Sequence, residues 1–172
     1  MFWNNVQDRE GDDIDVTRLI KRAKFDIFLS GITLNYVIES QAELIRTAIK
    51  ERGVRVLMVI ASDSKNSGRT YKRYTRNIDE RLPQSHRNYC DFFSTLTPEE
   101  AGRIDIRETA LLITHSIGMY DKEIYISEFC LDVDSRLVPS YCLTESDSAY
   151  RIFVQEIGIL TDESRSIVKN PR

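Results

Sequence analysis

The segment 114–129, THSIGMYDKEIYISEF, contains the residues of this chain that are best suited to chemistry. His115 is one of only two histidines, and Asp121 follows it six positions later, ahead of the strand-like run EIYIS. An imidazole can attack phosphorus or protonate a leaving oxygen, and a nearby carboxylate can orient the ring. The spacing therefore suggests the hypothesis of a site for phosphodiester cleavage.

A second candidate is the basic segment 65–87. It holds seven Lys/Arg and two Asp/Glu, a charge of +5, whereas the whole chain carries −3 and the remainder therefore −8. A basic island on an acidic body predicts that an anionic ligand binds there. The simpler interpretation is a solvated helix face with scattered arginines.

Length and composition predict an ordinary globular protein. We expect an acidic leader over 1–13 and a single domain over 14–172, with 41% hydrophobic and 30% charged residues in the whole chain. Cys90, Cys130 and Cys142 are an odd number and form no C-x-x-C pair. This pattern argues against a disulfide framework and a zinc site, so we expect no metal, no cofactor and a cytoplasmic location. No apolar run approaches the length of a membrane span.

The elements that must position these residues follow from the hydrophobic pattern. An amphipathic helix over 16–24 precedes a strand over 25–32, and a helix over 35–51 ends at Gly53. The run 54–62 is almost continuously apolar, as in a strand buried on both faces. Two strands joined by a helix predict a parallel pair with a right-handed crossover.

The second half of the chain predicts more helices and then several strands. We expect helices over 69–82 and 87–97, strands over 104–109, 110–120, 123–131 and 136–144, and a closing helix over 147–160. This order predicts an α/β fold, with one mixed β-sheet flanked by helices on both faces.

The order of these elements over residues 14–166, with the strand GVRVLMVI and the 114–129 segment, resembles a single repeat of the phospholipase D-like superfamily. The resemblance implies a phospholipase D-like sandwich and a motif H-x-K-x-x-x-x-D. In that motif a histidine attacks phosphorus, a lysine neutralises the phosphoryl oxygens and an aspartate orients a histidine. It also implies a homodimer, because catalytic relatives of this size build one site from two chains.

The motif can be placed in two registers. With Asp121 in the aspartate position, Thr114 takes the histidine position and Ser116 the lysine position, and the next strand then falls where the family has one. With His115 in the histidine position, Ile117 takes the lysine position. Both registers lose the lysine, and in the first register His115 points to the opposite sheet face from Thr114 and Ser116.

We therefore expect no catalytic residues, because a threonine without an adjacent base is a poor nucleophile. His115 is then a hydrogen-bonded core or edge residue. A polar pocket should still remain at the strand ends, with Tyr71 or Tyr74 available to stack on a base. The residues expected to line this pocket are Ser30, Gly31, Ser62, Asp63, Arg69, Lys72, Arg73, Arg76, Arg107, Thr114, Ser116 and Asp121.

The leading hypothesis is an inactive domain that senses a small anionic, phosphate-containing ligand such as a nucleotide. The resemblance implies that such domains belong to regulatory or defence proteins. One alternative is a divergent nuclease or phosphodiesterase that uses His115 and Asp121 through a β-bulge. Another is nucleic-acid binding through the basic segment 65–87.

Overall fold

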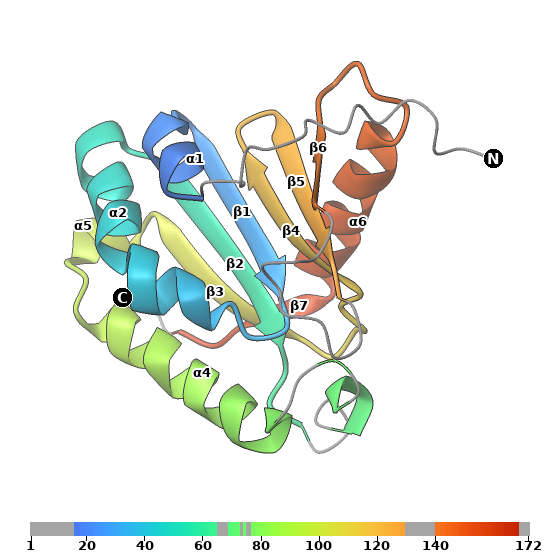
Figure 1. The fold of residues 1–172 in the computed structure, drawn as a ribbon. Coiled ribbons are helices and arrows are strands. Elements are labelled where there is room, and N and C mark those ends of the chain that lie inside the picture. Colours follow the sequence, from blue (N-terminus) through green and yellow to red (C-terminus); the bar gives the residue numbers. More distant parts are fainter. Residues whose placement is uncertain (1–15, 65–68, 73, 75–76, 130–139, 169–172) are drawn as a thin grey trace.

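A seven-stranded mixed sheet forms the centre of the molecule (Figure 1), in the order β6-β5-β4-β1-β2-β3-β7. The structure is a computed structural model and describes residues 16–64, 69–72, 74, 77–129 and 140–168. In chain order the elements are α1 (Val16–Arg22), β1 (Asp26–Gly31), α2 (Asn35–Arg52), β2 (Arg55–Ala61), α4 (Ile78–Ser94), α5 (Pro98–Ala101), β3 (Ile104–Thr109), β4 (His115–Tyr120), β5 (Glu123–Glu128), β6 (Ser140–Leu143), α6 (Tyr150–Asp162) and β7 (Ser164–Ser166).

The direction of the strands decides which residues meet. β1, β2 and β3 are parallel, and β4 runs antiparallel to β1. The carboxyl ends of β1, β2 and β3 therefore meet the start of β4 at one edge of the sheet, which we call the strand-end edge. The parallel β-α-β unit predicted from the sequence is confirmed.

Two apolar cores cover the two faces of the sheet. One core packs α1, α2, α5 and the second half of α4 against one face, and the other packs α6 against the opposite face and includes Ile78 and Leu82 from the start of α4. β2 contributes to both cores: Met58 and Ile60 point into the first and Val59 into the second, all fully buried. The predicted fold class, a mixed α/β sheet with helices on both faces, is confirmed.

The predicted boundary between helices 69–82 and 87–97 is wrong. Asn77 adopts a left-handed conformation (φ 56°), and α4 then continues without a break through Pro83. Apolar burial outweighs the hydrogen bond lost at the proline, because the buried positions form one helical stripe. Its members are Ile78, Leu82, Ser85, Tyr89, Phe92 and Phe93.

Two strand predictions also need correction. The predicted strand 110–120 begins only at His115, and the short strand β7 at the edge of the sheet was not predicted. β7 has only three residues and pairs antiparallel with β3. A strand of three polar residues shows no alternation of apolar and polar side chains. Its members, Ser164, Arg165 and Ser166, are held in the sheet by pairing with β3.

Glu100 links α5 to α2 through a capping box and an ion pair. Thr97 and Glu100 cap each other, and Arg46 Nε lies 3.1 Å from Glu100 Oε1. Hydrogen bonds from Arg46 and from the backbone N–H of Thr97 lower the pKa of Glu100 to about 2.

Replacing Glu100 with glutamine should lower the melting temperature in a pH-dependent way. The folded-state pKa lies below the unfolded value of about 4.3, so the carboxylate stabilises the fold above that pH. This contribution is lost as the pH falls toward about 2. We expect the difference in Tm between wild type and Glu100→Gln to be largest at neutral pH and to vanish near pH 2. Thermal unfolding followed by circular dichroism measures it, and Glu99→Gln, at an exposed neighbour, should show a smaller effect.

Candidate functional site

The strand-end edge brings together six of the predicted site residues. Ser30 and Gly31 end β1, Ser62 and Asp63 follow β2, and Thr114 and Ser116 lie at the start of β4. The pairing Ser30↔Ile117 and the hydrogen bond from Ser62 N to Thr109 O (2.9 Å) hold the segments in register. Asp63 and Thr114 are exposed, whereas Ser30 and Ser62 are buried.

The first residues of β4 point to opposite faces of the sheet. Ser116 lies on the α2 face, where its hydroxyl donates to Ser30 O (3.3 Å) and lies near Gly31. His115 lies on the α6 face, with its ring centre 5.9 Å from that of Phe153 and Nδ1 4.0 Å from Glu156 Oε1. No β-bulge turns His115 back, because β4 pairs with β5 residue by residue from His115 to Tyr120. The imidazole therefore does not share a sheet face with Ser116. The expectation that Thr114 has no adjacent base is wrong, however, because the Thr114 hydroxyl lies 2.9 Å from His115 Nδ1.

The amino terminus of α2 also lies at the strand-end edge, a feature that the sequence did not reveal. Leu34 precedes this 18-residue helix in a left-handed conformation (φ 49°), and no side chain caps the helix. A Cβ added to Gly31 would lie 2.7 Å from Leu34 Cδ2 and 3.5 Å from Ser116 Oγ, so the helix start and Ser116 flank the same glycine. Uncapped backbone N–H groups at a helix start attract anions. The missing Ser, Thr, Asp or Asn at the N-cap is the signal that could have indicated this site.

Two hydrogen bonds from α4 hold this strained helix start in place. Ser85 Oγ donates to Thr33 O (2.6 Å), and the Tyr89 hydroxyl donates to Leu34 O (3.0 Å). Burial raises the pKa of Tyr89, so its hydroxyl stays protonated and remains a donor. Tyr36, in the first turn of α2, is 58% exposed, and its hydroxyl accepts a hydrogen bond from Gln41 Nε2 (3.1 Å). The left-handed Leu34 is thus maintained by packing from another helix.

Asp121 does not belong to the strand-end edge. It lies in the β4–β5 turn at the opposite end of β4, and its carboxylate accepts hydrogen bonds from the backbone N–H groups of Lys24, Phe25 and Asp26. Partial burial raises the pKa of Asp121, but these three donors outweigh it and hold the pKa below its usual value. Its position in the motif reflects turn geometry, because a left-handed φ of 55° suits aspartate.

Arg107 is also not a member of the predicted pocket. Its guanidinium bonds to Asp105 Oδ2 (2.6 Å) and to Thr161 O (2.9 Å). The side chain therefore joins β3 to the end of α6. Alternation along β3 puts Arg107 on the face that α6 covers.

The basic segment is described only in part. Arg69 and Lys72 are exposed, and Lys72 pairs with Asp79 (2.7 Å), whereas Arg73 and Arg76 lie outside the described residues. Tyr71 is 2% exposed and unavailable for stacking on a base. Tyr74 is 40% exposed, and its ring centre lies 6.5 Å from that of Phe129.

Tyr71 instead fastens the loop between β3 and β4. Its hydroxyl accepts a hydrogen bond from Ile113 N (2.8 Å) and donates to Leu111 O (3.4 Å). Replacing Tyr71 with phenylalanine leaves the buried Ile113 N–H without a partner, so we expect a loss of about 1–3 kcal/mol in the free energy of unfolding. Urea denaturation measures the loss. Tyr74→Phe is the matched control, and an equal loss in both variants would contradict this role.

A histidine, a carboxylate and a guanidinium form a cluster beside the strand-end edge that the sequence did not predict. His86 lies within α4, and its Nε2 donates to Ala61 O (3.0 Å). Its Nδ1 lies 3.7 Å from Glu108 Oε2, and Arg165 Nε donates to Glu108 Oε1 (2.7 Å). The cluster joins α4, β3 and β7.

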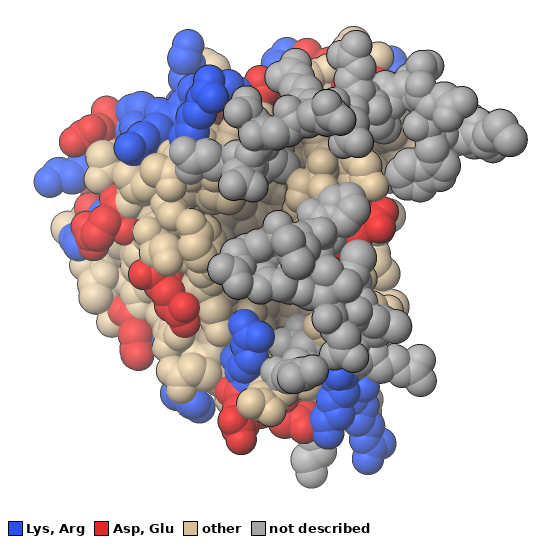
Figure 2. Space-filling model, viewed as in Figure 1, with Lys and Arg blue, Asp and Glu red and all other residues tan. Residues whose placement is uncertain are grey.

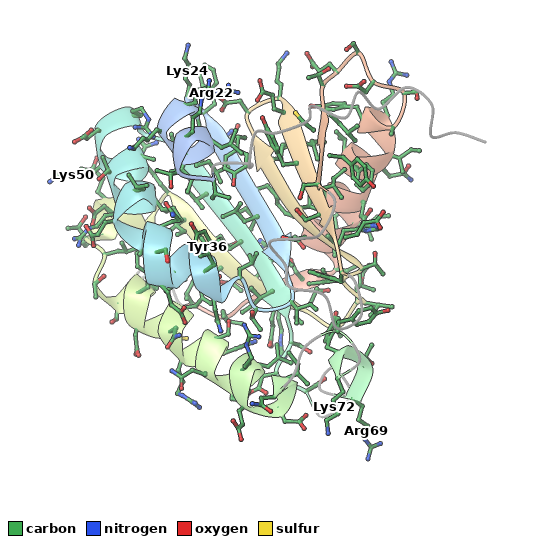
Figure 3. All side chains as sticks on the ribbon, viewed as in Figure 1. Arg22, Lys24, Tyr36, Lys50, Arg69 and Lys72 are labelled. Atoms are coloured by element: carbon green, nitrogen blue, oxygen red, sulfur yellow. The ribbon has the colours of Figure 1, made fainter. Side chains whose placement is uncertain are left out.

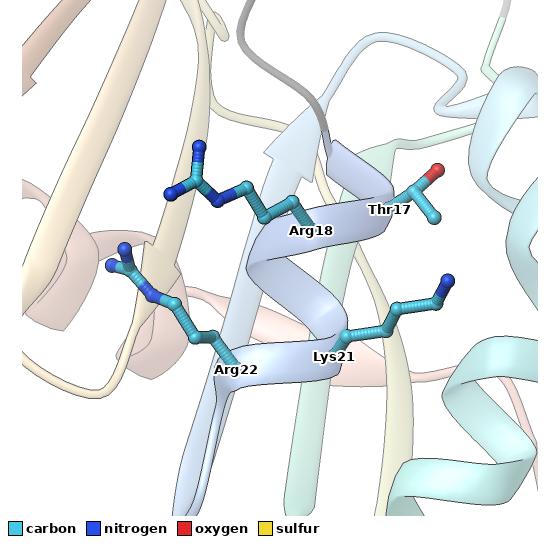
Figure 4. A pocket seen from close by; sticks show the side chains of 4 residues that line it. All are labelled: Thr17, Arg18, Lys21 and Arg22. Atoms are coloured by element: carbon cyan, nitrogen blue, oxygen red, sulfur yellow. The ribbon is translucent and has the colours of Figure 1, made fainter.

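Basic side chains gather at both ends of the molecule (Figure 2). Arg69 and Lys72 lie at one end, and Arg22 and Lys24 lie at the other (Figure 3). A pocket of about 390 Å³ at the second end is lined by Thr17, Arg18, Lys21 and Arg22 of α1 (Figure 4). The run RLIKRAK over 18–24, with four basic and no acidic residues, could have indicated this cluster.

Among the described residues, no group of three or more His, Cys, Asp or Glu side chains is arranged to hold a metal ion. None of the helices in the described ranges combines the length and apolar character that a bilayer span requires.

Comparison with known proteins gives structural neighbours only. No family model matches the sequence, and no curated protein matches it. Phosphatidylserine synthase of Haemophilus influenzae Rd KW20 is similar in structure, with a TM-score of 0.64 and 10% identity over 88% of this chain and 36% of the synthase. TrmBL2, an archaeal chromatin protein with a novel mode of DNA binding, has a TM-score of 0.54 and 12% identity over 88% of this chain and 48% of its own.

These neighbours establish the fold alone, because their identities are so low. The likeness to the synthase agrees with the phospholipase D-like sandwich predicted from the sequence. This chain spans less than half the length of either neighbour.

Proposed function

We propose that this chain is a member of the phospholipase D-like superfamily that binds a small phosphate-containing ligand at the strand-end edge without cleaving it. The observation that carries this proposal is the separation of His115 from Ser116 and the start of α2 by the thickness of the sheet. In the register set by Asp121, hydroxyl groups occupy the positions of the nucleophile and the lysine.

The groups that remain at the edge are suited to binding phosphate. The uncapped start of α2 offers backbone N–H groups, and Ser116 offers a hydroxyl beside Gly31. Thr114 is exposed, with its hydroxyl 2.9 Å from His115 Nδ1. Tyr36 provides an exposed ring for a base, which favours a nucleotide over inorganic phosphate. The Ser116 hydroxyl donates to Ser30 O and, with the helix N–H groups, stabilises phosphate without attacking it. The Thr114 hydroxyl has a base beside it in His115, so the His115→Ala assay decides whether this pair cleaves phosphodiesters.

A thermal-shift panel tests the binding. It contains inorganic phosphate, nucleotides, cyclic nucleotides, sugar phosphates and inositol phosphates. A ligand at 100 times its Kd should stabilise the fold by about 2.7 kcal/mol. Ser116→Val and Tyr36→Ala should weaken the response, whereas Ser148→Ala, at an exposed hydroxyl before α6, should leave it unchanged. A panel without any response would overturn the proposal.

A phosphodiesterase assay tests the absence of cleavage. Bis(p-nitrophenyl) phosphate should not be hydrolysed by the wild-type chain. Hydrolysis that disappears in His115→Ala would instead support the divergent nuclease or phosphodiesterase, and it would overturn the non-cleaving part of the proposal while leaving binding intact.

Nucleic-acid binding is the second candidate, favoured by the basic cluster of α1 at one end and Arg69 and Lys72 at the other. TrmBL2, one of the structural neighbours, binds DNA. Phosphate contacts of this kind predict an affinity for duplex DNA that falls steeply with salt. The double variant Arg18→Glu, Lys21→Glu should reduce the slope with which the logarithm of the DNA affinity falls against the logarithm of the salt concentration. A DNA affinity that does not depend on salt would exclude this candidate.

A further inference from the structure

The outward face of α6 exposes large apolar side chains. Ile152 is 64% exposed and Ile159 is 49% exposed, whereas Ile157 and Leu160 of the same helix are buried against the sheet. Ile152 and Ile159 are seven residues apart and therefore lie on one side of the helix. Gly158 is exposed as well, and a Cβ added to it would meet no atom within 4 Å. Ile152 and Ile159 therefore form an apolar stripe on the exposed side of α6, and Gly158 adds no side chain to the same helix surface.

A loop beside the end of α6 extends the apolar surface. Leu111 and Leu112, which follow β3, are 38% and 54% exposed. Thr109 Oγ1 donates to Glu163 O (3.2 Å), and Thr109 pairs with Ser164 in the sheet. These contacts hold the start of the loop next to the carboxyl-terminal end of α6.

The charges at the two ends of α6 are opposite to those that favour an isolated helix. Arg151 lies in the first turn and Asp162 in the last, and the helix has no acidic residue in its first turn and no basic residue in its last. A helix dipole favours the reverse arrangement. Neither side chain has a hydrogen-bond or ion-pair partner within the described part of the chain. Intramolecular contacts there do not account for their placement.

We propose that α6 packs antiparallel against α6 of a second copy of this chain, around a two-fold axis near Glu156. The pairs Ile152–Ile159 and Arg151–Asp162 are both centred close to that residue. One axis therefore brings Ile152 against Ile159 of the other copy and Arg151 against Asp162 of the other copy. Such an interface is self-complementary, as two-fold symmetry requires.

The second copy supplies each α6 with a negative charge near its amino terminus and a positive charge near its carboxyl terminus, which the helix itself lacks. Each Arg151 gains a carboxylate at the positive end of its own helix, and each Asp162 gains a guanidinium at the negative end. Glu156 does not oppose its counterpart at the axis, because it turns toward His115. The resemblance noted in the sequence implied a homodimer but no surface for it; this proposal does not depend on the ligand at the strand-end edge.

Sedimentation velocity over a range of protein concentrations tests the association. Wild-type protein should form a dimer. Ile152→Asp and Ile159→Asp should each raise the dissociation constant about tenfold or more, because each places a charge in the apolar stripe. Far-UV circular dichroism confirms that the variants are folded. A wild-type protein that is monomeric at all concentrations, or a dimer that both variants leave unchanged, would overturn the proposal.

A charge exchange separates this interface from any other. Arg151→Glu and Asp162→Arg should each weaken the dimer, although each places a charge that the helix dipole favours and so should not lower the Tm of the monomer. The double variant should restore dimerisation, whereas Arg81→Glu, at an exposed cation of α4, should have no effect. A double variant as weak as the single ones would contradict antiparallel pairing. A monomer that binds neutral phosphatidylcholine vesicles through Ile152 and Ile159 would assign this face to a lipid surface instead.

Discussion

Replacing Asp121 with alanine is expected to lower the free energy of unfolding by about 3 kcal/mol, although the residue lies in an apparently simple turn. Its carboxylate accepts the backbone N–H groups of Lys24, Phe25 and Asp26 at 2.8–3.0 Å. Alanine removes all three bonds to a charged acceptor and must also adopt a left-handed φ of 55°. The start of β1 then loses three of its hydrogen bonds to the β4–β5 turn and keeps the backbone bond from Asp121 N to Asp26 O (2.9 Å).

Urea denaturation of Asp121→Ala and Asp121→Asn separates these contributions. Asparagine tolerates the left-handed conformation and keeps one oxygen acceptor, so its loss should be about half as large. The contribution also depends on pH. Because the folded-state pKa of Asp121 is lowered, the stabilisation is present above the unfolded pKa and is lost as the pH falls through the folded pKa. A stable Asp121→Ala variant that fails to bind phosphate would contradict the structural role and return Asp121 to the binding site.

Replacing Arg165 with alanine is expected to lower the free energy of unfolding by about 2 kcal/mol. Arg165 Nε lies 2.7 Å from Glu108 Oε1, and Glu108 is only 8% exposed. Without the guanidinium, the buried carboxylate keeps only His86, whose Nδ1 is 3.7 Å away. Loss of one partner of a buried ion pair costs about 3–5 kcal/mol, but Arg165 is 82% exposed, so solvent reduces the effect.

A double-mutant cycle identifies the cause of this loss. Glu108→Gln removes the buried charge and should cost less than Arg165→Ala. If the unpaired carboxylate is what destabilises Arg165→Ala, the double variant should be about as stable as Glu108→Gln alone. Guanidinium chloride denaturation at pH 7 gives the free energies. Additive losses would show instead that Arg165 acts mainly by holding β7 on the sheet.

Two residues of the predicted pocket, Arg107 and Asp121, lie away from the strand-end edge. Ser30, Gly31, Ser62, Asp63, Thr114 and Ser116 were placed by the order of the strands, because every residue that ends a parallel strand lies at the same edge. Arg107 and Asp121 were misplaced. The spacing of residues does not reveal that the Arg107 guanidinium bonds to Thr161 O. Nor does it reveal that the Asp121 carboxylate accepts three backbone N–H groups from the segment that leads into β1.

The sequence by itself determined the parallel β-α-β unit, the alternation of side chains in β4 and the end of α2 at Gly53. These features depend on local periodicity and on residues that tolerate a left-handed φ. Only the tertiary structure decided that Ser85 and Tyr89 of α4 hold the strained start of α2 beside Ser116. Only the tertiary structure also brought His86, Glu108 and Arg165 together, from three elements far apart in the sequence. The physical reason is that packing between distant segments selects these contacts, and no pattern within any one segment encodes them.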